Sequence, residues 1–247
     1  MIHDFGKKRL DTWLEENNFF VSRNIASNAI SLGLVSVNGE VITKNSTKIS
    51  TNDEVKIKKD HHIYVSRSAN KLKFLIQKTS FSIVGLSCLD LGASTGGFTE
   101  VLLEHGASRV YAVDIGHDQL SKSLKENPKV INMERTDSRK INIDIIIATD
   151  LISIDLSFIS LEKAIENVIV NAKSGTLFYI LFKPQFEVGR EEISKNGIVK
   201  NQLLVWSKLL KFREWLIDRR INKIKLFKSP ILGKDGNQEW LFFGKKV

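Results

Sequence analysis

The spacing of apolar residues changes within the first sixty positions from a helical period to strand alternation. Apolar positions recur at i, i+3 and i+4 in Arg9–Leu14, which predicts a first helix there. A second helix is expected to begin after Ser22, a typical N-cap residue, and to end at Gly33. Short strands are expected around the Asn38-Gly39 turn and at Val55–Ile57. The pattern predicts a small α+β module.

The remainder of the chain alternates apolar strands with helices. Ser87–Leu91 is an apolar strand that leads into a glycine-rich turn, and residues 98–105 follow at helical spacing. Further strands are expected at Arg109–Asp114 and Thr176–Phe182. The stretch after residue 141 leaves two placements for a fourth strand, which would end near Asp150 or at Asp155. Such alternation is typical of a parallel sheet covered by helices.

The composition of the chain predicts a polyanionic binding partner. The 247 residues, 42% of them hydrophobic, suffice for one full α/β domain and one small module. The formal net charge is +9, which favours binding to phosphates. Residues 200–247 contain 12 basic and 4 acidic side chains, a net charge of +8, so most of the excess lies near the C-terminal end.

Cysteine, histidine and apolar runs restrict the possible classes of protein. The single cysteine, Cys88, precludes an internal disulfide, and Cys and His do not cluster with the spacing of metal ligands. The first twenty residues carry charges of both signs and lack the apolar run of a signal peptide. No apolar stretch approaches the roughly 20 residues that span a bilayer. We therefore expect a cytoplasmic protein with no metal and no membrane contact.

The glycine-rich turn after Asp90 has the chemistry of a nucleoside site. Its spacing, G-x-x-x-G-G from Gly92, differs from the dinucleotide pattern, and it lacks the Gly-Lys-Ser/Thr of a Walker loop. Neither NAD nor ATP is therefore favoured. Glycines allow the backbone to approach a ligand closely. Asp90 is placed to orient an amino group of the ligand, and Asp114, at the end of the next strand, to accept bonds from ribose hydroxyls.

The N-terminal pattern resembles the alpha-L RNA-binding motif, which occurs in a small-subunit ribosomal protein, bacterial tyrosyl-tRNA synthetases and pseudouridine synthases. The matching features are RLDxxL from residue 9, SRxxAxxxIxxGxVxVNG from residue 22, Lys44, and DEVxI from residue 53. The resemblance implies RNA contacts from Arg9, Arg23 and Lys44. It also implies a small core made of Leu10, Leu14, Ile25, Ala29 and Val37. Because residues 1–65 carry a net charge of only +1, we expect this module to recognise RNA shape.

Motifs along the rest of the chain resemble the TlyA (haemolysin A) family of FtsJ-like RNA 2'-O-methyltransferases. In chain order they are VSRSANKL from residue 65, LDLGASTGGFT from 89, DIG from 114, ERT from 134, DLSFISL from 155, KPQFEVG from 183 and GNQE from 236. With the N-terminal module, they cover essentially the whole chain. The DLSF motif also favours Leu151–Asp155 as the fourth strand.

The resemblance implies an α/β fold in which a small α+β alpha-L RNA-binding domain precedes a Rossmann-like, seven-stranded methyltransferase domain. We place the first domain at residues 1–60, a linker at 61–65 and the second domain at 66–247. The implied cofactor is S-adenosylmethionine, and the implied partner is ribosomal RNA or a ribosomal subunit, with a cytidine ribose as the methyl acceptor. The residues implied at the cofactor are Asp90, Gly92, Ala93, Ser94, Thr95, Gly96, Gly97, Phe98, Asp114, Asp137 and Asp155.

A Lys-Asp-Lys-Glu tetrad is used by FtsJ-like enzymes, and the matching residues are Lys71, Asp155, Lys183 and Glu239. A ribose hydroxyl is a poor nucleophile, so a base must accept its proton as it attacks the methyl group. We expect Lys183 to be that base, with Lys71 as a second positive charge nearby. Arg67, in the segment before Lys71, is a further expected RNA contact. A positively charged methyl donor requires no metal.

Two other functions compete with this interpretation. One is an RNA-binding protein whose methyltransferase domain is inactive, which the complete tetrad disfavours. The other is a pore-forming haemolysin, for which the sequence offers neither an amphipathic membrane segment nor an export signal. The segment Glu187–Asn201 is either a loop over the substrate, with Lys195 and Lys200 near phosphate, or an ordinary surface loop.

Overall fold

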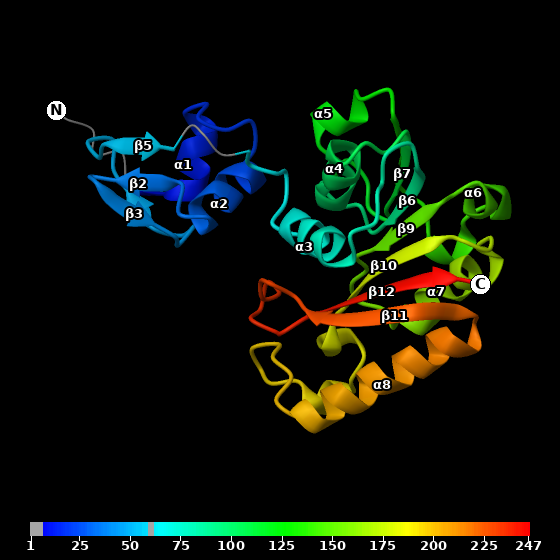
Figure 1. Ribbon diagram of the computed structural model, residues 1–247. Helices are drawn as coiled ribbons and strands as arrows, with labels where there is room; N and C mark the ends of the chain where they lie inside the picture. Colours follow the sequence, from blue (N-terminus) through cyan, green and yellow to red (C-terminus); the bar gives the residue numbers. More distant parts are fainter. Residues whose placement is uncertain (1–6, 59–61) are drawn as a thin grey trace. The chain divides into compact units, whose positions relative to one another are not determined.

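The computed structural model describes residues 7–58 and 62–247, and the chain divides into two compact units, Met1–Arg67 and Ser68–Val247 (Figure 1). The expected domain boundary after residue 60 and the first linker residue, 61, lie outside the described residues. The end of the expected linker is bound to the first unit, because the Asn28 side-chain amide donates a 2.9 Å hydrogen bond to the Tyr64 carbonyl.

The first unit contains two helices and two small sheets. The helices are α1 (Leu10–Glu16) and α2 (Arg23–Ser31). The strands are β1 (Lys8–Arg9), β2 (Val35–Val37), β3 (Glu40–Ile42), β4 (Lys48–Ile49) and β5 (Val55–Ile57). The sheet β3-β2-β5 is antiparallel, and β1 pairs with β4. Ser22 caps α2 by accepting a hydrogen bond from the Ile25 N–H, and the positive φ of Gly33 (+68°) turns the chain after it, as the sequence predicted.

The core of the first unit differs from the expectation at one position. The buried cluster consists of Leu10, Leu14, Ala26, Ala29, Ile30, Val35, Val37 and Ile49. Ile25 was expected in this core but is only partly buried. The inward face of α2 is formed by Ala26, Ala29 and Ile30, which follow the i, i+3, i+4 spacing, so Ile25 lies at the edge of that face.

Asp11 joins the two arginines of the first unit. Its buried carboxylate accepts hydrogen bonds from Arg9 Nη2 at 2.8 Å and from Arg23 Nε at 3.1 Å. Burial opposes ionisation of this carboxyl, but the two guanidinium groups outweigh burial and lower its pKa to about 2. Asp11 therefore fixes both arginines, whose side chains stay partly exposed, on one side of α1 and α2.

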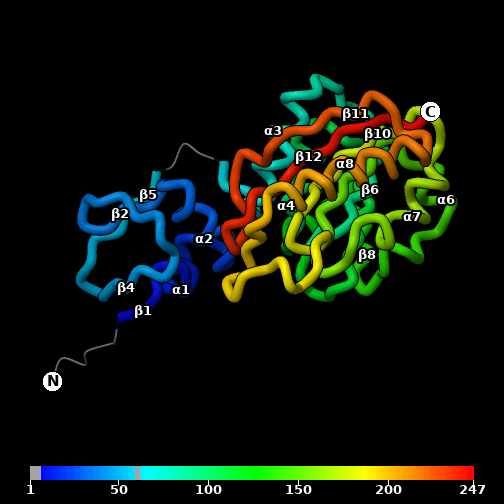
Figure 2. The backbone as a smooth tube through the Cα atoms, turned by 90° about the horizontal axis from the view of Figure 1, so that it is seen from below, coloured from blue at the N-terminus to red at the C-terminus, as the bar shows by residue number. Residues whose placement is uncertain are grey.

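The second unit is built on a seven-stranded sheet in the order β11-β12-β10-β9-β6-β7-β8, which confirms the expected fold class. The strands are β6 (Ser87–Leu91), β7 (Arg109–Val113), β8 (Val130–Met133), β9 (Leu151–Ile154), β10 (Leu177–Phe182), β11 (Ile221–Lys228) and β12 (Trp240–Lys246). Strand β12 is antiparallel to both of its neighbours, and the other contacts are parallel. Figure 2 shows β12, in red, between β10 and β11. The position of β9 confirms the second of the two placements.

Helices cover both faces of this sheet (Figure 1). They are α3 (Ala69–Thr79), α4 (Gly97–Glu104), α5 (Lys122–Lys125), α6 (Ile143–Ile147), α7 (Leu161–Asn171) and α8 (Gln202–Asp218), with short 3-10 turns at η1 (Ser138–Lys140), η2 (Pro184–Phe186) and η3 (Arg190–Glu192). Within residues 7–58 and 62–247, no helix has the length and apolarity to cross a membrane.

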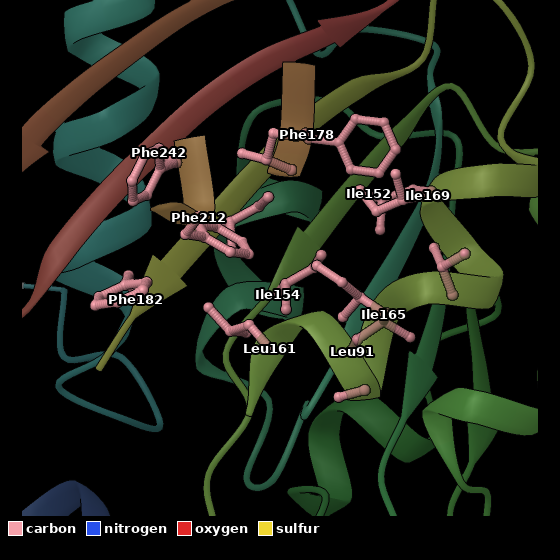
Figure 3. Close-up of a cluster of buried hydrophobic side chains, with 14 of the residues drawn as sticks. Leu91, Ile152, Ile154, Leu161, Ile165, Ile169, Phe178, Phe182, Phe212 and Phe242 are labelled. Atoms are coloured by element: carbon pink, nitrogen blue, oxygen red, sulfur yellow. The ribbon is translucent and has the colours of Figure 1, made fainter. Parts of the chain in front are cut away.

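The main core lies between the sheet and helices α7 and α8 (Figure 3). Strand residues such as Ile152, Phe178 and Phe182 contact Ile165 and Phe212 from the helices. The Phe182 and Phe212 rings lie 5.5 Å apart. This packing fixes the register of β9 and β10, so the loops that follow their carboxyl ends meet at one edge of the sheet.

The Asp11 cluster leads to a prediction about the stability of the first unit. Asp11→Asn should lower its free energy of unfolding by about 1–3 kcal/mol near neutral pH, because two guanidinium groups lose their shared carboxylate. Since the pKa of Asp11 is about 2 in the folded state and 3.8 ordinarily, this stabilisation is present above pH 3.8 and is lost as the pH falls toward 2. Thermal unfolding followed by Trp13 fluorescence measures it. Glu54→Gln, which breaks the exposed Lys56 pair, is the control and should change little.

Candidate functional site

The glycine-rich turn lies against the end of β9. Gly92 has φ +84°, and a Cβ at this position would collide with the carbonyl of Asp155. The N–H groups of Gly92 and Ala93 both bind the Val113 carbonyl, at 2.9 and 3.0 Å. The Asp155 N–H in turn binds the Leu91 carbonyl at 2.9 Å. The turn is therefore attached to the ends of both strands that flank β6.

Gly96 lies where the loop passes over two leucines. It has φ +100°, and a Cβ there would meet the side chains of Leu120 and Leu124. The absence of a side chain at Gly96 therefore allows these leucines to pack against the loop, and a contact between its backbone and a ligand remains a prediction. Among the other expected cofactor residues, Ser94 is exposed with φ +49°, Thr95 is partly buried, Gly97 begins α4, and Phe98 is buried in the core.

Asp90 lies beneath the turn and is entirely buried. Burial raises its pKa to about 7, although hydrogen bonds from Thr99 Oγ1 at 2.7 Å and Ser153 Oγ at 2.8 Å favour the ionised form. These hydroxyls connect Asp90 to α4 and β9. The carboxylate thus supports the loop from below, and a contact between Asp90 and a ligand remains a prediction.

Asp114 organises the loop at the end of β7. One carboxylate oxygen accepts the Ser94 N–H at 2.8 Å and the other accepts the Gly116 N–H at 2.7 Å. Glu134, at the end of β8, accepts the N–H groups of Gln119 and Leu120 at 2.7 and 3.0 Å. Each Asp114 oxygen retains a free lone pair, so the carboxylate can still accept a bond from a ribose hydroxyl.

Asp137 caps the short η1 turn and is bound by Arg139. Both carboxylate oxygens accept hydrogen bonds from this guanidinium, which holds the pKa of Asp137 at about 2. The neighbouring motif residue Glu134 has a clear structural role, but that of Asp137 toward a ligand remains a prediction.

The tetrad residues form two lysine–carboxylate pairs. Lys183 Nζ lies 2.6 Å from Asp155 Oδ1 and donates a 2.8 Å hydrogen bond to Ser157 Oγ. Lys71 Nζ, on the first turn of α3, lies 2.5 Å from Glu239 Oε2, and this pair is almost completely buried. Each ammonium group therefore has its own carboxylate partner.

Strand register brings the two pairs to the same edge. Phe182 of β10 is paired with Trp240 of β12, so Lys183 and Glu239 are the next residues along this antiparallel ladder. Ile180 is paired with Ile154, so Asp155 leaves the neighbouring strand at the same edge. Lys71, which is far away in the sequence, joins them only because α3 packs against β12.

Two further residues at this edge were missed by sequence reasoning. Ser157 binds Lys183, and Phe158 has φ +68° with a side chain that is 91% exposed. The Phe158 ring lies 5.1 Å from that of Phe186 in η2. A positive φ is strained for a phenylalanine, and such strain is concentrated at functional sites. The DLSF and KPQF motifs contained both aromatic residues, but the spacing did not indicate that they meet.

The segment Glu187–Asn201 is attached to the fold at both ends. Glu187, whose pKa is raised by burial, accepts hydrogen bonds from Ser160 Oγ and the Leu161 N–H at the start of α7. Asn237 accepts the Val199 N–H and donates to the Gly197 carbonyl, at 2.9 and 2.8 Å. Lys195 and Lys200 are exposed. This segment is thus connected directly to the loop that carries Glu239.

The expected RNA contacts lie in the first unit. Arg9 and Arg23 are held together by Asp11, while Lys44 and Arg67 are exposed. In the described part of the chain, no group of three His, Cys, Asp or Glu residues could hold a metal ion.

Comparisons with known proteins identify the family of each unit. Residues 64–246 match the FtsJ-like methyltransferase family, and residues 8–55 match the S4 domain. Hemolysin A from Brachyspira hyodysenteriae is 35% identical over 94% of this chain and 98% of that protein. The 16S/23S rRNA (cytidine-2'-O)-methyltransferase TlyA of Mycobacterium tuberculosis is 34% identical over 96% of this chain and 89% of its own length.

Solved structures give the same result. A structure from Streptococcus thermophilus, named as a candidate hemolysin, is 35% identical, covers 97% of this chain and 89% of its own, and has a TM-score of 0.74. The S4 match confirms the expected alpha-L type of module, and the relatives confirm the resemblance to TlyA. Because the family model covers residues 64–246, well over half of the chain, the chain belongs to the FtsJ-like methyltransferases, among relatives that include TlyA.

Proposed function

We propose that this protein transfers a methyl group from S-adenosylmethionine to a ribose 2'-hydroxyl of ribosomal RNA, with a cytidine as the acceptor. The observation that carries the proposal is the meeting of two lysine–carboxylate pairs with a glycine-rich turn at one edge of the sheet. The relative from Mycobacterium tuberculosis, named for this reaction on both ribosomal RNAs, supports the choice of substrate. A ribosomal substrate also implies a cytoplasmic location.

The residues of the glycine-rich turn fit a nucleoside cofactor. The backbone from Gly92 to Gly97 turns tightly without bulky side chains, and Asp114 stands at the end of the adjacent strand with lone pairs for a ribose. Asp137 lies one strand further along, where it would contact the same ligand. When bound, S-adenosylmethionine supplies a methyl group on a positively charged sulfur.

We assign Lys183 as the general base, a role that requires its ammonium group to release a proton to solvent before the acceptor hydroxyl reacts. In the proposed reaction its Nζ accepts the proton of the 2'-hydroxyl as that oxygen attacks the methyl carbon. Asp155 and Ser157 hold Nζ from two directions, so the lone pair of the neutral amine has a fixed orientation. The buried Lys71–Glu239 pair supplies a second, fixed positive charge that stabilises the oxygen as it loses its proton.

Phe158 and the first unit would bind the RNA around the acceptor. The exposed Phe158 ring is suited to stack on the nucleobase of the acceptor nucleotide after that nucleotide has flipped out of the RNA helix. Arg9, Arg23, Lys44 and Arg67 of the first unit would contact RNA phosphates. Two of these arginines are prepositioned by Asp11, which lowers the entropy lost on binding.

Methyl transfer to ribosomal subunits tests the proposal directly. Subunits purified from a strain that lacks the gene should accept tritium from labelled S-adenosylmethionine, and mapping of 2'-O-methyl positions should locate it on a cytidine. Binding of RNA without any transfer would instead identify an inactive methyltransferase that serves as an RNA-binding protein.

Lys183→Ala should reduce methyl transfer by a factor of at least ~100 while the protein still binds S-adenosylmethionine and RNA. Lys183→Arg should be nearly as inactive, because a guanidinium group does not give up its proton at any relevant pH. Single-turnover rates measure the loss. Lys122→Glu, at an exposed lysine of α5, is the control and should retain full activity. A near-normal rate in the arginine variant would contradict the general-base role.

Gly92→Ala should weaken S-adenosylmethionine binding at least about tenfold, because the new Cβ must displace the Asp155 backbone. Gly175→Ala is a matched control, since Gly175 has a similar φ of +94° but no atom within 4 Å of the Cβ position. Calorimetry should give an unchanged affinity for this control. Equal losses in the two variants would show that backbone strain, and not the contact with Asp155, is responsible.

Phe158→Ala should lower kcat/KM for RNA about tenfold, the usual effect of removing one stacking contact, and leave cofactor affinity unchanged. Phe158→Tyr should retain most of the activity because it keeps an aromatic face. Steady-state transfer to ribosomal subunits measures both variants. An alanine variant with normal kcat/KM would remove Phe158 from the acceptor site.

A further inference from the structure

Helix α8 and the end of β11 carry an aromatic and basic cluster that the proposed reaction does not use. We infer that Trp206, Trp240 and Lys228 form a second RNA-binding surface on the catalytic unit, where Trp206 stacks on a base of a single-stranded segment and Lys228 binds its phosphate. This inference rests on the proposed function, because it assumes an RNA substrate.

The three side chains form a continuous cluster. The Trp206 and Trp240 rings are 4.7 Å apart at 61°, and Lys228 Nζ lies 5.7 Å from the centre of the Trp240 ring. Trp240 is buried beneath the other two, with 5% of its surface exposed, whereas Trp206 is 45% exposed. The indole N–H of Trp240 has no hydrogen-bond acceptor in the part of the chain that the structure describes. The cluster therefore presents a fixed aromatic surface to solvent and contains an unused donor.

The exposed face of α8 is not required by the fold. The helix packs on the sheet through Val205, Leu209, Phe212 and Leu216. Leu203, Trp206 and Leu210 recur at i, i+3 and i+7 on a different face, and all three are exposed. A contiguous exposed apolar stripe is uncommon on a soluble protein without a ligand or partner.

The charge around the cluster favours RNA over an apolar protein partner. Residues 200–247 carry a net charge of +8, and Lys228 is exposed with no carboxylate partner among the described residues. Lysines on β11 also protect an edge strand from pairing with another chain, and Lys223 and Lys225 are accounted for in this way. Edge protection does not account for an exposed tryptophan beside a lysine. That combination is the one used to bind single-stranded nucleic acid.

The cluster is continuous with the catalytic edge of the sheet. Lys228 is paired with Trp240 in the β11–β12 ladder, and Trp240 directly follows Glu239. An RNA strand whose acceptor ribose lies near Lys183 therefore reaches Lys228 by passing the first residue of β12, Trp240. The surface would hold nucleotides that flank the acceptor and would act independently of the first unit.

Filter binding of ribosomal RNA from the deletion strain to the full-length protein tests this surface. Trp206→Ala should raise the Kd at least about tenfold, while Trp206→Phe should bind nearly as wild type. Lys228→Glu should weaken binding at least about fivefold and reduce the slope of log Kd against log salt by about one. Quenching of Trp206 fluorescence by RNA, absent in Trp206→Phe, would report stacking itself. S-adenosylmethionine affinity should be unchanged in every variant, and Lys122→Glu is the charge control. Trp206→Ala should lower the melting temperature because it uncovers the Trp240 ring, whereas Trp206→Phe should largely retain it.

The possible outcomes separate this inference from the proposed function. Wild-type RNA affinity in both Trp206→Ala and Lys228→Glu would overturn the second surface while methyl transfer could still proceed. Weaker binding in these variants of a protein that transfers no methyl group would support the surface and reject the enzymatic proposal. A dimer, seen by light scattering, that Trp206→Ala converts to monomers would assign the surface to a second copy of this chain and overturn RNA stacking.

Discussion

The close contact between Gly92 and the backbone of Asp155 is the constraint on which the site depends. The strand β6 ends at Leu91, whose carbonyl accepts the Asp155 N–H, and the chain then turns so tightly that a Cβ at Gly92 has no room. The loop assigned to the cofactor and the strand that carries a catalytic carboxylate are therefore one rigid piece. A displacement of β9 along β6 would break the contact between Gly92 and the Asp155 backbone, so the register of these two strands sets the position of Asp155 relative to the loop.

Charge balance at this edge explains how two lysines can lie in a largely buried site. Lys71 is paired with Glu239 and Lys183 with Asp155, so neither ammonium group is left without a carboxylate. The two lysine side chains are about equally buried, with 9% of Lys71 and 12% of Lys183 exposed. The pairs differ in their partners, because Asp155 is more exposed than Glu239 and Lys183 also donates a hydrogen bond to the Ser157 hydroxyl. The proposal assigns a fixed electrostatic role to the first pair and proton transfer to the second.

The proposed RNA contacts are of two kinds, arginines held in place on the first unit and exposed aromatic rings on the catalytic unit. In the first unit, Asp11 holds Arg9 and Arg23 in one arrangement, which suits recognition of a folded RNA shape. On the catalytic unit, exposed aromatic rings at Phe158 and Trp206 suit unpaired nucleotides, because any base presents a face for stacking. The proposed RNA contacts thus use a nearly neutral first unit together with a strongly basic C-terminal segment.

The sequence alone determined the division into two modules, the helices and strands of the first module and the central strands of the second. Local signals were sufficient for these, because Ser22 and Gly33 delimit a helix through their own backbone preferences, and the apolar runs at β6 and β10 had the length of buried strands. For β9 the apolar pattern left two placements, and the resemblance of the DLSF motif was needed to choose between them. The motifs, compared with a known family, indicated Lys71, Asp155, Lys183 and Glu239. Tertiary structure decided how they pair. The Lys71–Glu239 contact joins residues 168 positions apart, and the Trp206–Trp240 contact joins a residue of α8 to a residue of β12. Tertiary structure also placed Leu120 and Leu124 against Gly96 and left Ile25 only partly buried. These positions depend on packing between elements, which no local pattern encodes.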